Sequence, residues 1–396
     1  MKVAIYSGTI PAPVFIESLI QSLAEQGVSV YLFGRKTSSE NYNNRGNRVF
    51  LTPSHGILRI GFVLIQIVRL LVTSPGRYIR LFIHYRKISK NDSIRFINWW
   101  CKVLPVVNHL PDIFHIQWAK ALPNWFFLKD LFGVKIVLSL RGAHINYSPL
   151  ANEYLAIQYR ELFPKVDYFH AVSRAIASEA GKYGAEEKRI KVIYSGAHTE
   201  LLQYYRKKDW KSDNPFRFIS VGRFHWKKGY HFALSAISAL VAGDIPVHYT
   251  IITQDQPTEE ILYQINDLTL QDHVMLRHPT NQEEVYNKMS LSDCLLLPSV
   301  EEGIANVVLE AMAIGLPVIS SDCGGMKEVI EHKKNGFLFH KRDVNHLSQM
   351  MLDMINRDPI ERKLMADRAR TIIEKNCDLS RLGSEMKELY CSLEFA

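Results

Sequence analysis

Cysteine is scarce and scattered in this sequence of 396 residues. Its five cysteines are odd in number, far apart and never spaced as Cys-x-x-Cys. This excludes a disulfide-stapled miniprotein, gives no sign of a zinc site and favours a reducing compartment such as the cytosol. The sequence also lacks short repeats and low-complexity tracts. Its 47% hydrophobic and 22% charged residues exclude disorder, collagen and coiled coil.

Two kinds of apolar segment are also missing. The first residues, MKVAIYSG, read as a buried strand and not as a charged stretch followed by an apolar one, so we expect no cleaved export signal. Residues 57–72, ILRIGFVLIQIVRLLV, are very apolar but include Arg59, Gln66 and Arg69. Because an arginine in mid-bilayer is expensive, we expect this segment to lie on a surface and not to span a membrane.

Acidic residues are nearly missing from residues 53–102. This stretch has one acid, Asp92, and its bases are Arg59, Arg69, Arg77, Arg80, Arg86, Lys87, Lys90, Arg95 and Lys102. The stretch therefore accounts for the whole formal net charge of +8, and the balanced remainder disfavours nucleic-acid binding. Residues 77–100 interleave these bases with aromatic and aliphatic side chains, as in a helix face seated on anionic lipid headgroups. The alternatives are domain helices with apolar core faces and solvated arginines, or a contact with a polyanionic acceptor or a partner protein.

Short apolar runs alternate twice with longer helical periods, which predicts α/β architecture with two doubly wound parallel sheets. Strands of the first series are expected at residues 2–7, 29–33, 48–51, 112–117, 135–140, 168–172 and 189–194. Those of the second are expected at 218–221, 249–252, 274–276, 294–297, 318–320 and 337–339. Two such domains would face each other across a cleft, and ligands of such sheets bind beyond the carboxyl ends of the strands.

The domain boundaries follow from composition. We expect an N-terminal domain at residues 1–198, a polar linker without strong periodicity at 199–215 and a C-terminal domain at 216–378. The remaining segment, about 379–396, is expected to form a helix that returns to the N-terminal domain.

Residues 298–330, PSVEEGIANVVLEAMAIGLPVISSDCGGMKEVI, contain the strongest chemical signal. A strand runs into an acidic loop, and a helix begins near Asn306, so the backbone of Gly303, Ile304, Ala305 and Asn306 presents free N–H groups to an anion. Glu302 and Glu310 could accept hydrogen bonds from hydroxyls of one ligand. Carboxylates disfavour phosphate, so the combination indicates a ligand that is part phosphate and part sugar. The alternative is a helix start decorated with acids for capping and dipole reasons.

A second signal is SVGRFHWKKG, residues 220–229, where a strand ends at Gly222. Arg223 could hold phosphate bidentately, and Lys228 could add a point charge, so that together they stabilise a departing diphosphate. Alternatively, both are solvated residues at a strand exit.

These segments resemble the family 4 glycosyltransferases, the large retaining group with the two-domain GT-B fold. Glu302-Gly303 to Glu310 is similar to their E-x7-E signature, VGRFHWKKG to their phosphate motif, and GLPVISSDCGGMKEVI to the stretch that follows. VIYSGAH, residues 192–198, resembles the end of their first domain. The resemblance covers essentially the whole chain.

The resemblance implies roles for individual residues. Arg223 and Lys228 would bind the donor diphosphate, Glu310 the ribose hydroxyls and Glu302 the donor sugar, while the backbone of residues 303–306 would meet sugar and phosphate. Gly222 belongs to the same phosphate motif. In the N-terminal domain, Gly8 resembles the glycine that lets the first loop approach the phosphates.

Two further N-terminal segments match with departures. DIFHIQWA from residue 112 retains His115, which would act in catalysis unless it is a satisfied packing residue. SLRGAH from residue 139 has Arg141 in place of histidine, so Arg141 could offer charge to a phosphate or an acidic sugar. IITQDQP and RHPTNQEEV lack glycines that the family has near the nucleotide, which leaves the base open.

No Asp-x-Asp triplet occurs, so we expect no metal and no other cofactor, with a nucleoside diphosphate sugar as co-substrate. Closure of the domains would exclude water. The acceptor hydroxyl would attack the donor sugar from the same face from which the leaving group departs. The expected function is retaining sugar transfer in bacterial surface polysaccharide or glycolipid assembly. The alternatives are a GT-B sugar-nucleotide epimerase or phosphorylase, or a non-catalytic anion-binding scaffold. The expected location is cytoplasmic, with residues 57–102 in contact with the inner face of an anionic membrane. The expected acceptor is a glycan or a lipid-linked molecule.

Overall fold

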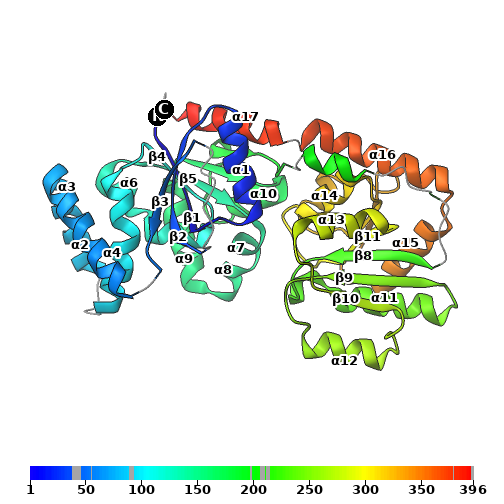
Figure 1. Ribbon diagram of the computed structural model, residues 1–396. Coiled ribbons are helices and arrows are strands. Elements are labelled where there is room, and N and C mark those ends of the chain that lie inside the picture. Colours follow the sequence, from blue (N-terminus) through cyan, green and yellow to red (C-terminus); the bar gives the residue numbers. More distant parts are fainter. Residues whose placement is uncertain are drawn as a thin grey trace. The chain divides into compact units, whose positions relative to one another are not determined.

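The computed structural model describes residues 1–37, 46–54, 56–88, 93–196, 199–205, 210, 215–377 and 379–393. The chain forms two compact units. The first comprises Met1–Val172, Ala177–Ile193 and Leu382–Ala396, and the second comprises Ser173–Ile176 and Tyr194–Arg381. Each is built on its own parallel sheet (Figure 1).

The sheet of the first unit has seven strands in the order β3-β2-β1-β4-β5-β6-β7, all parallel. The strands are β1 Val3–Ile10, β2 Val30–Lys36, β3 Arg48–Thr52, β4 Ile113–Ile116, β5 Lys135–Leu140, β6 Tyr168–Ala171 and β7 Ile190–Val192. Central strands are buried on both faces and read as continuous apolar runs, which is why composition alone locates them.

The helices that accompany this sheet come from the first part of the chain, together with the last helix of the chain. They are α1 Val14–Glu25, α2 Gly56–Thr73, α3 Pro75–Ile88, α4 Ser93–Asn108, η1 Ala119–Ala121, α5 Leu122–Trp125, α6 Phe127–Phe132, α7 Gly142–Asn146, α8 Ser148–Ala151, α9 Glu153–Leu162, η2 Phe163–Lys165, α10 Arg174–Gly181, η3 Glu187–Arg189 and α17 Leu379–Ser392. The stretch 77–100 thus falls on two helices, α3 and α4, and residues 89–92 between them lie outside the described residues.

The sheet of the second unit has six parallel strands in the order β10-β9-β8-β11-β12-β13. The strands are β8 Phe216–Val221, β9 Val247–Ile252, β10 Val274–Arg277, β11 Cys294–Leu297, β12 Val318–Ser321 and β13 Phe337–Phe339. Its helices are η4 Thr199–Tyr204, η5 Trp226–Lys228, α11 Tyr230–Ala242, α12 Glu259–Asp267, α13 Gln282–Leu291, α14 Asn306–Ile314, η6 Met326–Glu328, α15 Val344–Asn356 and α16 Pro359–Asn376. Two doubly wound sheets confirm the predicted fold class.

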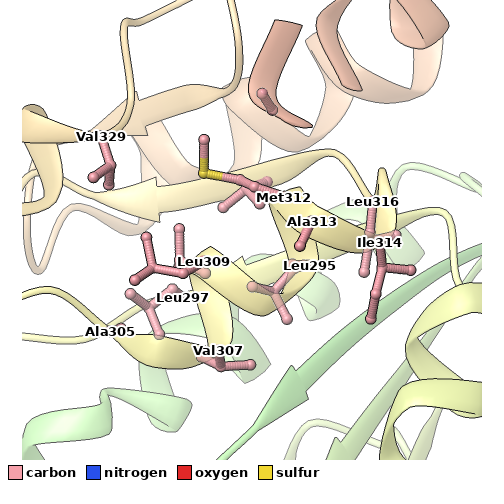
Figure 2. Packing of buried hydrophobic residues seen from close by; sticks show 14 of the residues in the cluster. Leu295, Leu297, Ala305, Val307, Leu309, Met312, Ala313, Ile314, Leu316 and Val329 are labelled. Carbon is pink, nitrogen blue, oxygen red and sulfur yellow. The ribbon is translucent and has the colours of Figure 1, made fainter. Parts of the chain in front are cut away.

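The core of the second unit fixes the helix that carries the acidic motif. Leu295 and Leu297 of β11 pack with apolar side chains of α14, among them Leu309 and Met312 (Figure 2). Ala305, just before α14, belongs to the same cluster. The start of α14 is therefore positioned by core packing.

The last helix, α17, packs on the first unit, as the sequence predicts. A Cβ at Gly383 of α17 would lie 2.4 Å from the carbonyl oxygen of Ser22 on α1, so only glycine permits this approach. Lys387 Nζ also donates to the carbonyl of Gln26 at 2.9 Å. The helix is held by close backbone contact as well as by its buried apolar face.

Part of the predicted linker at 199–215 has regular structure. It contains η4, whose Leu201 is buried in the core of the second unit. Residues 206–209 and 211–214 of the linker, His198 at the end of the predicted first domain, residue 378, and 394–396 lie outside the described residues.

Helix α2 exposes its apolar side chains. Only Val63 and Leu70 of this helix are buried, while Arg59 and Gln66 bond to α4 through the side chains of Asn98 and Asn108. Its most exposed apolar residues are Ile57 (87%), Leu58 (69%), Ile65 (67%), Val68 (60%) and Val72 (79%). The alternative that apolar sides of these helices are core is therefore wrong for most of α2, whereas α4 buries Trp100, Val103 and Leu104. By length and composition alone, α2 is the one helix in the described parts of the chain that could cross a membrane, which is weak support for a span.

Candidate functional site

Two loops at the carboxyl edge of the second sheet are joined by their backbones. The loop after β8 contains η5, and the loop after β11 contains the acidic motif. The N–H of Val300 donates to the carbonyl of Lys227 at 2.7 Å. A Cβ at Gly229 would lie only 2.1 Å from the carbonyl oxygen of Pro298, and Gly229 has a φ of 65°. A glycine at this position is what lets the two loops meet.

Glu302 lies at the centre of the paired loops. Its carboxylate accepts from Lys228 Nζ at 2.7 Å and from Lys227 Nζ at 3.2 Å, and it is only 7% exposed. Ser299 Oγ donates to it at 3.3 Å. Burial raises the pKa of Glu302, but the two ammonium groups and their hydrogen bonds outweigh burial and lower the pKa overall. The structure thus brings together Lys228 and Glu302, and it adds Lys227, which sequence reasoning missed.

Two glycines clamp the acidic loop from the other side. A Cβ at Gly324 would lie 1.7 Å from the carbonyl oxygen of Glu302, and the φ of Gly324 is +51°. The N–H of Gly325 donates to the carbonyl of Gly303 at 2.6 Å. These glycines fix the backbone from which the Glu302 side chain projects.

The start of α14 has no side-chain cap. Its N-cap residue, Ala305, has no side-chain oxygen and makes no capping hydrogen bond. The side chains of Ile304 and Ala305 are buried in the core, so only their backbone can meet a ligand. The first N–H groups of α14 and the positive end of its dipole, at Asn306, therefore suit an anion.

Glu310 lies on α14, four residues beyond the start of the helix. It makes no hydrogen bond or ion pair with any residue that the structure describes, and it keeps partial exposure. Burial among neighbouring atoms raises its pKa to about 7. A half-buried carboxyl without a protein partner can accept hydrogen bonds from a ligand.

Arg223 follows directly after Gly222 at the end of β8. Its side chain is exposed and forms no ion pair within the described ranges. Burial lowers the pKa of His225, and the charges of Lys227, Arg223 and Lys228 lower it further. A Cβ at Gly222 would lie 3.3 Å from Lys228 Cε, so the lysine chain packs over the glycine, whose φ is +152°.

The first unit places His115 in its interior. The ring is fully buried; Nδ1 lies 2.7 Å from Tyr390 Oη on α17, and Nε2 lies 2.8 Å from Ser139 Oγ on β5. Burial, with the charges of His170 and Arg141, lowers its pKa well below the ordinary value. Because both ring nitrogens are engaged inside the protein, this structure does not support the predicted catalytic contact. The ring instead ties α17 to the sheet.

Arg141 lies just beyond β5, beside Gln117. Its Nη2 donates to Gln117 Oε1 at 3.1 Å, and its guanidinium lies 4.4 Å from the ring centroid of Phe15. Burial lowers the pKa of Arg141 to about 9. Its Nε and Gln117 Nε2 are buried without a hydrogen-bond partner in the described structure. Arg141 therefore keeps an unsatisfied donor inside the first unit, and its contact with a phosphate or an acidic sugar stays a prediction.

Gly8 lies where the pairing of β1 with β2 shifts register, between Tyr6 and Gly8. Its φ is +89°, a conformation that favours glycine, so its backbone departs from the regular strand near the carboxyl edge of the sheet.

With this geometry in view, comparison with known families gives a clear match. The family model described as Glycosyltransferase Family 4 matches residues 12–201, and the model described as Glycosyl transferases group 1 matches residues 203–372. The chain belongs to the family 4 glycosyltransferases. All the loops of the second unit described above lie inside the second match.

Two relatives of this family 4 protein are named for the biosynthesis of colanic acid and of amylovoran. It is 27% identical over 265 residues to the putative colanic acid biosynthesis glycosyltransferase WcaL of Escherichia coli, covering 65% of this chain and 64% of WcaL. It is 31% identical over 249 residues to the amylovoran biosynthesis glycosyltransferase AmsK of Erwinia amylovora, covering 61% of this chain and 60% of AmsK. The matched regions thus span less than two thirds of these relatives.

Solved structures share the fold over nearly the whole chain. Anabaena HepE in complex with UDP and glucose superposes with a TM-score of 0.72 at 18% identity, covering 99% of this chain and 100% of that one. Sucrose-phosphate synthase from Thermosynechococcus elongatus gives a TM-score of 0.75 at 17% identity, covering 99% of each chain. At this identity the likeness shows the GT-B fold.

Sequence reasoning missed three members of this site: Lys227, Gly324 and Gly325. Lys227 is adjacent to Lys228, and nothing in the spacing says that both lysines reach Glu302. The glycines occur as a pair in SSDCGG, a signal for close backbone approach that was available in the sequence. In the described residues, no group of three or more His, Cys, Asp and Glu side chains could hold a metal ion.

Proposed function

We propose that this protein is a retaining glycosyltransferase that moves a sugar from a nucleoside diphosphate sugar to an acceptor hydroxyl. The observation that carries the proposal is the Lys227–Glu302–Lys228 cluster on the paired loops of the second unit. Acid and base together beside the uncapped start of α14 suit a ligand with both hydroxyls and phosphates. A site for phosphate alone has no use for the carboxylate.

The roles divide by charge. Arg223, Lys228 and the start of α14 hold the diphosphate, because they offer bidentate, point and dipole stabilisation of negative charge. Glu302, kept ionised by its lysines, accepts from hydroxyls of the sugar. Glu310, which has no protein partner in the described chain, accepts from the ribose hydroxyls.

Catalysis follows from stabilisation of the leaving group. As the bond from the sugar to the diphosphate breaks, negative charge grows on the diphosphate, and cations already in place lower the energy of that state. The protein supplies this charge, so the proposed reaction uses no metal. The acceptor hydroxyl attacks from the face that the diphosphate leaves, which retains the anomeric configuration. Glu302 is occupied by two lysines, so we propose no covalent intermediate on it.

Polysaccharide or glycolipid assembly is the proposed setting, because WcaL and AmsK are named for colanic acid and amylovoran biosynthesis, and CapM of Staphylococcus aureus for capsular polysaccharide biosynthesis. The HepE structures with UDP and UDP-glucose make UDP-glucose the first donor to test.

The test of the proposed function follows the fate of the donor. The full chain is incubated with a panel of nucleotide sugars, with and without a saccharide acceptor, and the product anomer is read by NMR. A transferase consumes the donor largely in the presence of acceptor, with the anomer retained. Rapid acceptor-independent conversion of the donor to another nucleotide sugar would instead identify an epimerase, and reversible phosphate-dependent cleavage a phosphorylase.

One substitution tests the proposed donor binding by the second unit. Arg223→Ala removes an exposed side chain without hydrogen bonds in the described structure, so folding should be unaffected while transfer falls strongly. The exposed Arg342→Ala serves as a matched control. Equal transfer in Arg223→Ala and the wild type would remove Arg223 from the site.

We also propose that α2 and α3 seat the protein on an anionic membrane. Helix α2 presents apolar side chains outward while Arg59 and Gln66 bond inward, the reverse of an ordinary surface helix. Helix α3 ends with Arg86 and Lys87 and exposes Ile83 (50%). Exposed apolar residues beside bases fit an anionic lipid surface.

Vesicle flotation tests this seating. The wild type should float with vesicles that contain phosphatidylglycerol and bind far less to pure phosphatidylcholine. Ile65→Glu should abolish flotation without lowering Tm, because Ile65 is 67% exposed. Leu364→Glu, at a residue 47% exposed on α16, should float like the wild type. Absence of the wild type from both vesicle fractions would end the proposal.

A further inference from the structure

A cavity of about 480 Å³ lies at the carboxyl edge of the first sheet. Its walls come from the ends of three neighbouring strands, at Gly8 of β1, Arg35 of β2 and Thr52 of β3, and from helices α2 and α4. Ligands of doubly wound sheets bind at this edge, and small-molecule sites have volumes of roughly 300–1000 Å³. The cavity therefore has the place and size of a ligand site.

The charge of the cavity has one sign. Arg35, Arg59 and Lys102 line it, and none of the described lining residues is acidic. Arg35 and Lys102 are exposed and make no hydrogen bond or ion pair within the described ranges. Three cations around one hollow repel each other, and an anion between them removes that repulsion.

Arg59 is held in place while keeping donors free. Its Nε donates to the carbonyl of Pro53 at 3.1 Å, Nη1 to Asn98 Oδ1 at 2.7 Å and Nη2 to the carbonyl of Ser54 at 2.9 Å. A guanidinium has five N–H donors, so two remain for a ligand. A pre-positioned guanidinium of this kind suits phosphate oxygens.

The strand ends beneath the cations are closely packed. A Cβ at Gly34 would lie 2.9 Å from Ile10 Cγ1, so β1 and β2 approach each other at a position that only glycine allows. Thr52 Oγ1 donates to the carbonyl of Gly34 at 3.3 Å. This side of the cavity is therefore built from the sheet itself, which gives a rigid base for a bound group.

The same helix that supplies Arg59 carries the outward apolar face. Ile57, Leu58 and Ile60 flank Arg59 in sequence and are 87%, 69% and 47% exposed. A ligand with a charged head and an apolar chain would satisfy both features of α2. The chain of such a ligand would lie in the same membrane surface that this face of α2 is proposed to meet.

We propose that this cavity binds the phosphate or diphosphate of an amphiphilic acceptor, a lipid-linked saccharide, whose apolar chain lies along the exposed face of α2. The inference deepens the proposed function and rests on it, since it names the class of acceptor. Arg35, Arg59 and Lys102 are then residues that determine acceptor specificity.

The test uses geranyl diphosphate, a soluble amphiphile with a diphosphate head, titrated by calorimetry into the full chain. The titrations are made in a Lys228→Ala background, so that the phosphate seat of the second unit contributes little. Arg35→Gln combined with Lys102→Gln should weaken binding by about tenfold or more, because two charge-assisted contacts are lost. Lys36→Gln, at an exposed cation next to Arg35 that does not line the cavity, should change affinity less than about twofold.

Inorganic pyrophosphate and geraniol separate the two parts of the ligand. Both should bind at least about tenfold more weakly than geranyl diphosphate, since each lacks one contact surface. Pyrophosphate binding as tight as that of geranyl diphosphate, or equal affinities in the double variant and Lys36→Gln, would overturn the inference. Binding of nucleoside diphosphates by the wild type, measured in parallel, reports on the donor site. Its presence together with a negative result at the cavity rejects the inference alone, whereas its absence rejects the proposed function.

Discussion

The two units handle positive charge in opposite ways. In the second unit, Lys227 and Lys228 share Glu302, and the cluster is electrostatically satisfied by protein. In the cavity of the first unit, Arg35 and Lys102 have no acid near them among the described lining residues. A paired cluster can exchange partners when a ligand with hydroxyls and phosphates arrives, whereas unpaired cations suit a ligand whose contacting part is wholly anionic. This difference is the reason why we propose the donor site in the second unit and an anionic acceptor site in the first.

Removing Lys228 should produce the largest loss of transfer activity. We call the Lys227–Glu302–Lys228 cluster and its loops the paired side, and the cavity with Arg35 and Lys102 the unpaired side. We expect Lys228→Ala to lower transfer by roughly 100- to 1000-fold, the range seen when one preorganised stabilising group is lost. Steady-state transfer with saturating donor measures this, and a thermal melt checks that the chain is folded.

Lys227→Ala is the matched control, because Lys227 binds the same carboxylate at 3.2 Å. A clearly smaller loss in this variant would assign the Lys228 effect to phosphate contact. Equal losses in both would mean that the lysines act only by orienting Glu302, and Lys228 would lose its role at the diphosphate.

The rigidity of the paired side depends on Gly324. Gly324→Ala should destabilise the protein by about 2–4 kcal/mol, since its φ of +51° disfavours a side chain and the Cβ would collide with the Glu302 carbonyl at 1.7 Å. Gly27→Ala is the control: its φ is +72°, but nothing lies within 4 Å of the new Cβ, so about 1 kcal/mol is expected. Urea unfolding gives both values. Equal destabilisation would mean that φ alone matters and that the loop yields to the side chain.

The sequence predicted the strands well and the faces of some helices poorly. Buried parallel strands are short apolar runs, so β4 and β11 are evident from composition. Helix α2 is apolar over almost its whole circumference, so its pattern cannot say which side packs. The structure resolves this by turning Arg59 and Gln66 inward.

The candidate site was predictable where chemistry and spacing coincide, and less so where contacts are long-range. The Lys228–Glu302 pair joins two motifs that stand out separately in the sequence. The contact of His115 with Tyr390 spans 275 residues and could not be predicted from either local segment. The cavity lined by cations could not be predicted from the sequence, because Arg35, Arg59 and Lys102 lie on a strand and two helices and share no motif.

A carboxylate introduced into the cavity of the first unit would give its cations an acidic partner, as Glu302 does for the lysines of the second unit. Lys102→Glu reverses a charge in the cavity, so geranyl diphosphate affinity in the Lys228→Ala background should fall by about 2 kcal/mol, more than with Lys102→Gln. Calorimetry in low and high salt measures this, and the two variants should converge as salt screens the charge. Tighter binding in Lys102→Glu would contradict an anionic ligand.

The smallest expected effect is a pH dependence that distinguishes the two acids of the paired side. Burial raises the pKa of Glu310 from 4.5 to about 7, while the lysines lower that of Glu302. Because Glu310 binds its proton more tightly when folded, it lowers the free energy of unfolding of the ligand-free protein as pH rises from about 4.5 to about 7.

Hydroxyls that donate to the ionised carboxylate favour the deprotonated form, so nucleotide affinity should rise by about tenfold or less between pH 6 and pH 8. Calorimetry at several pH values should find no such slope in Glu310→Gln. Glu302→Gln should bind more weakly but keep the slope, since its own acid titrates below this range. A slope that disappears in Glu302→Gln and persists in Glu310→Gln would reverse the assignment of ribose and sugar to the two acids.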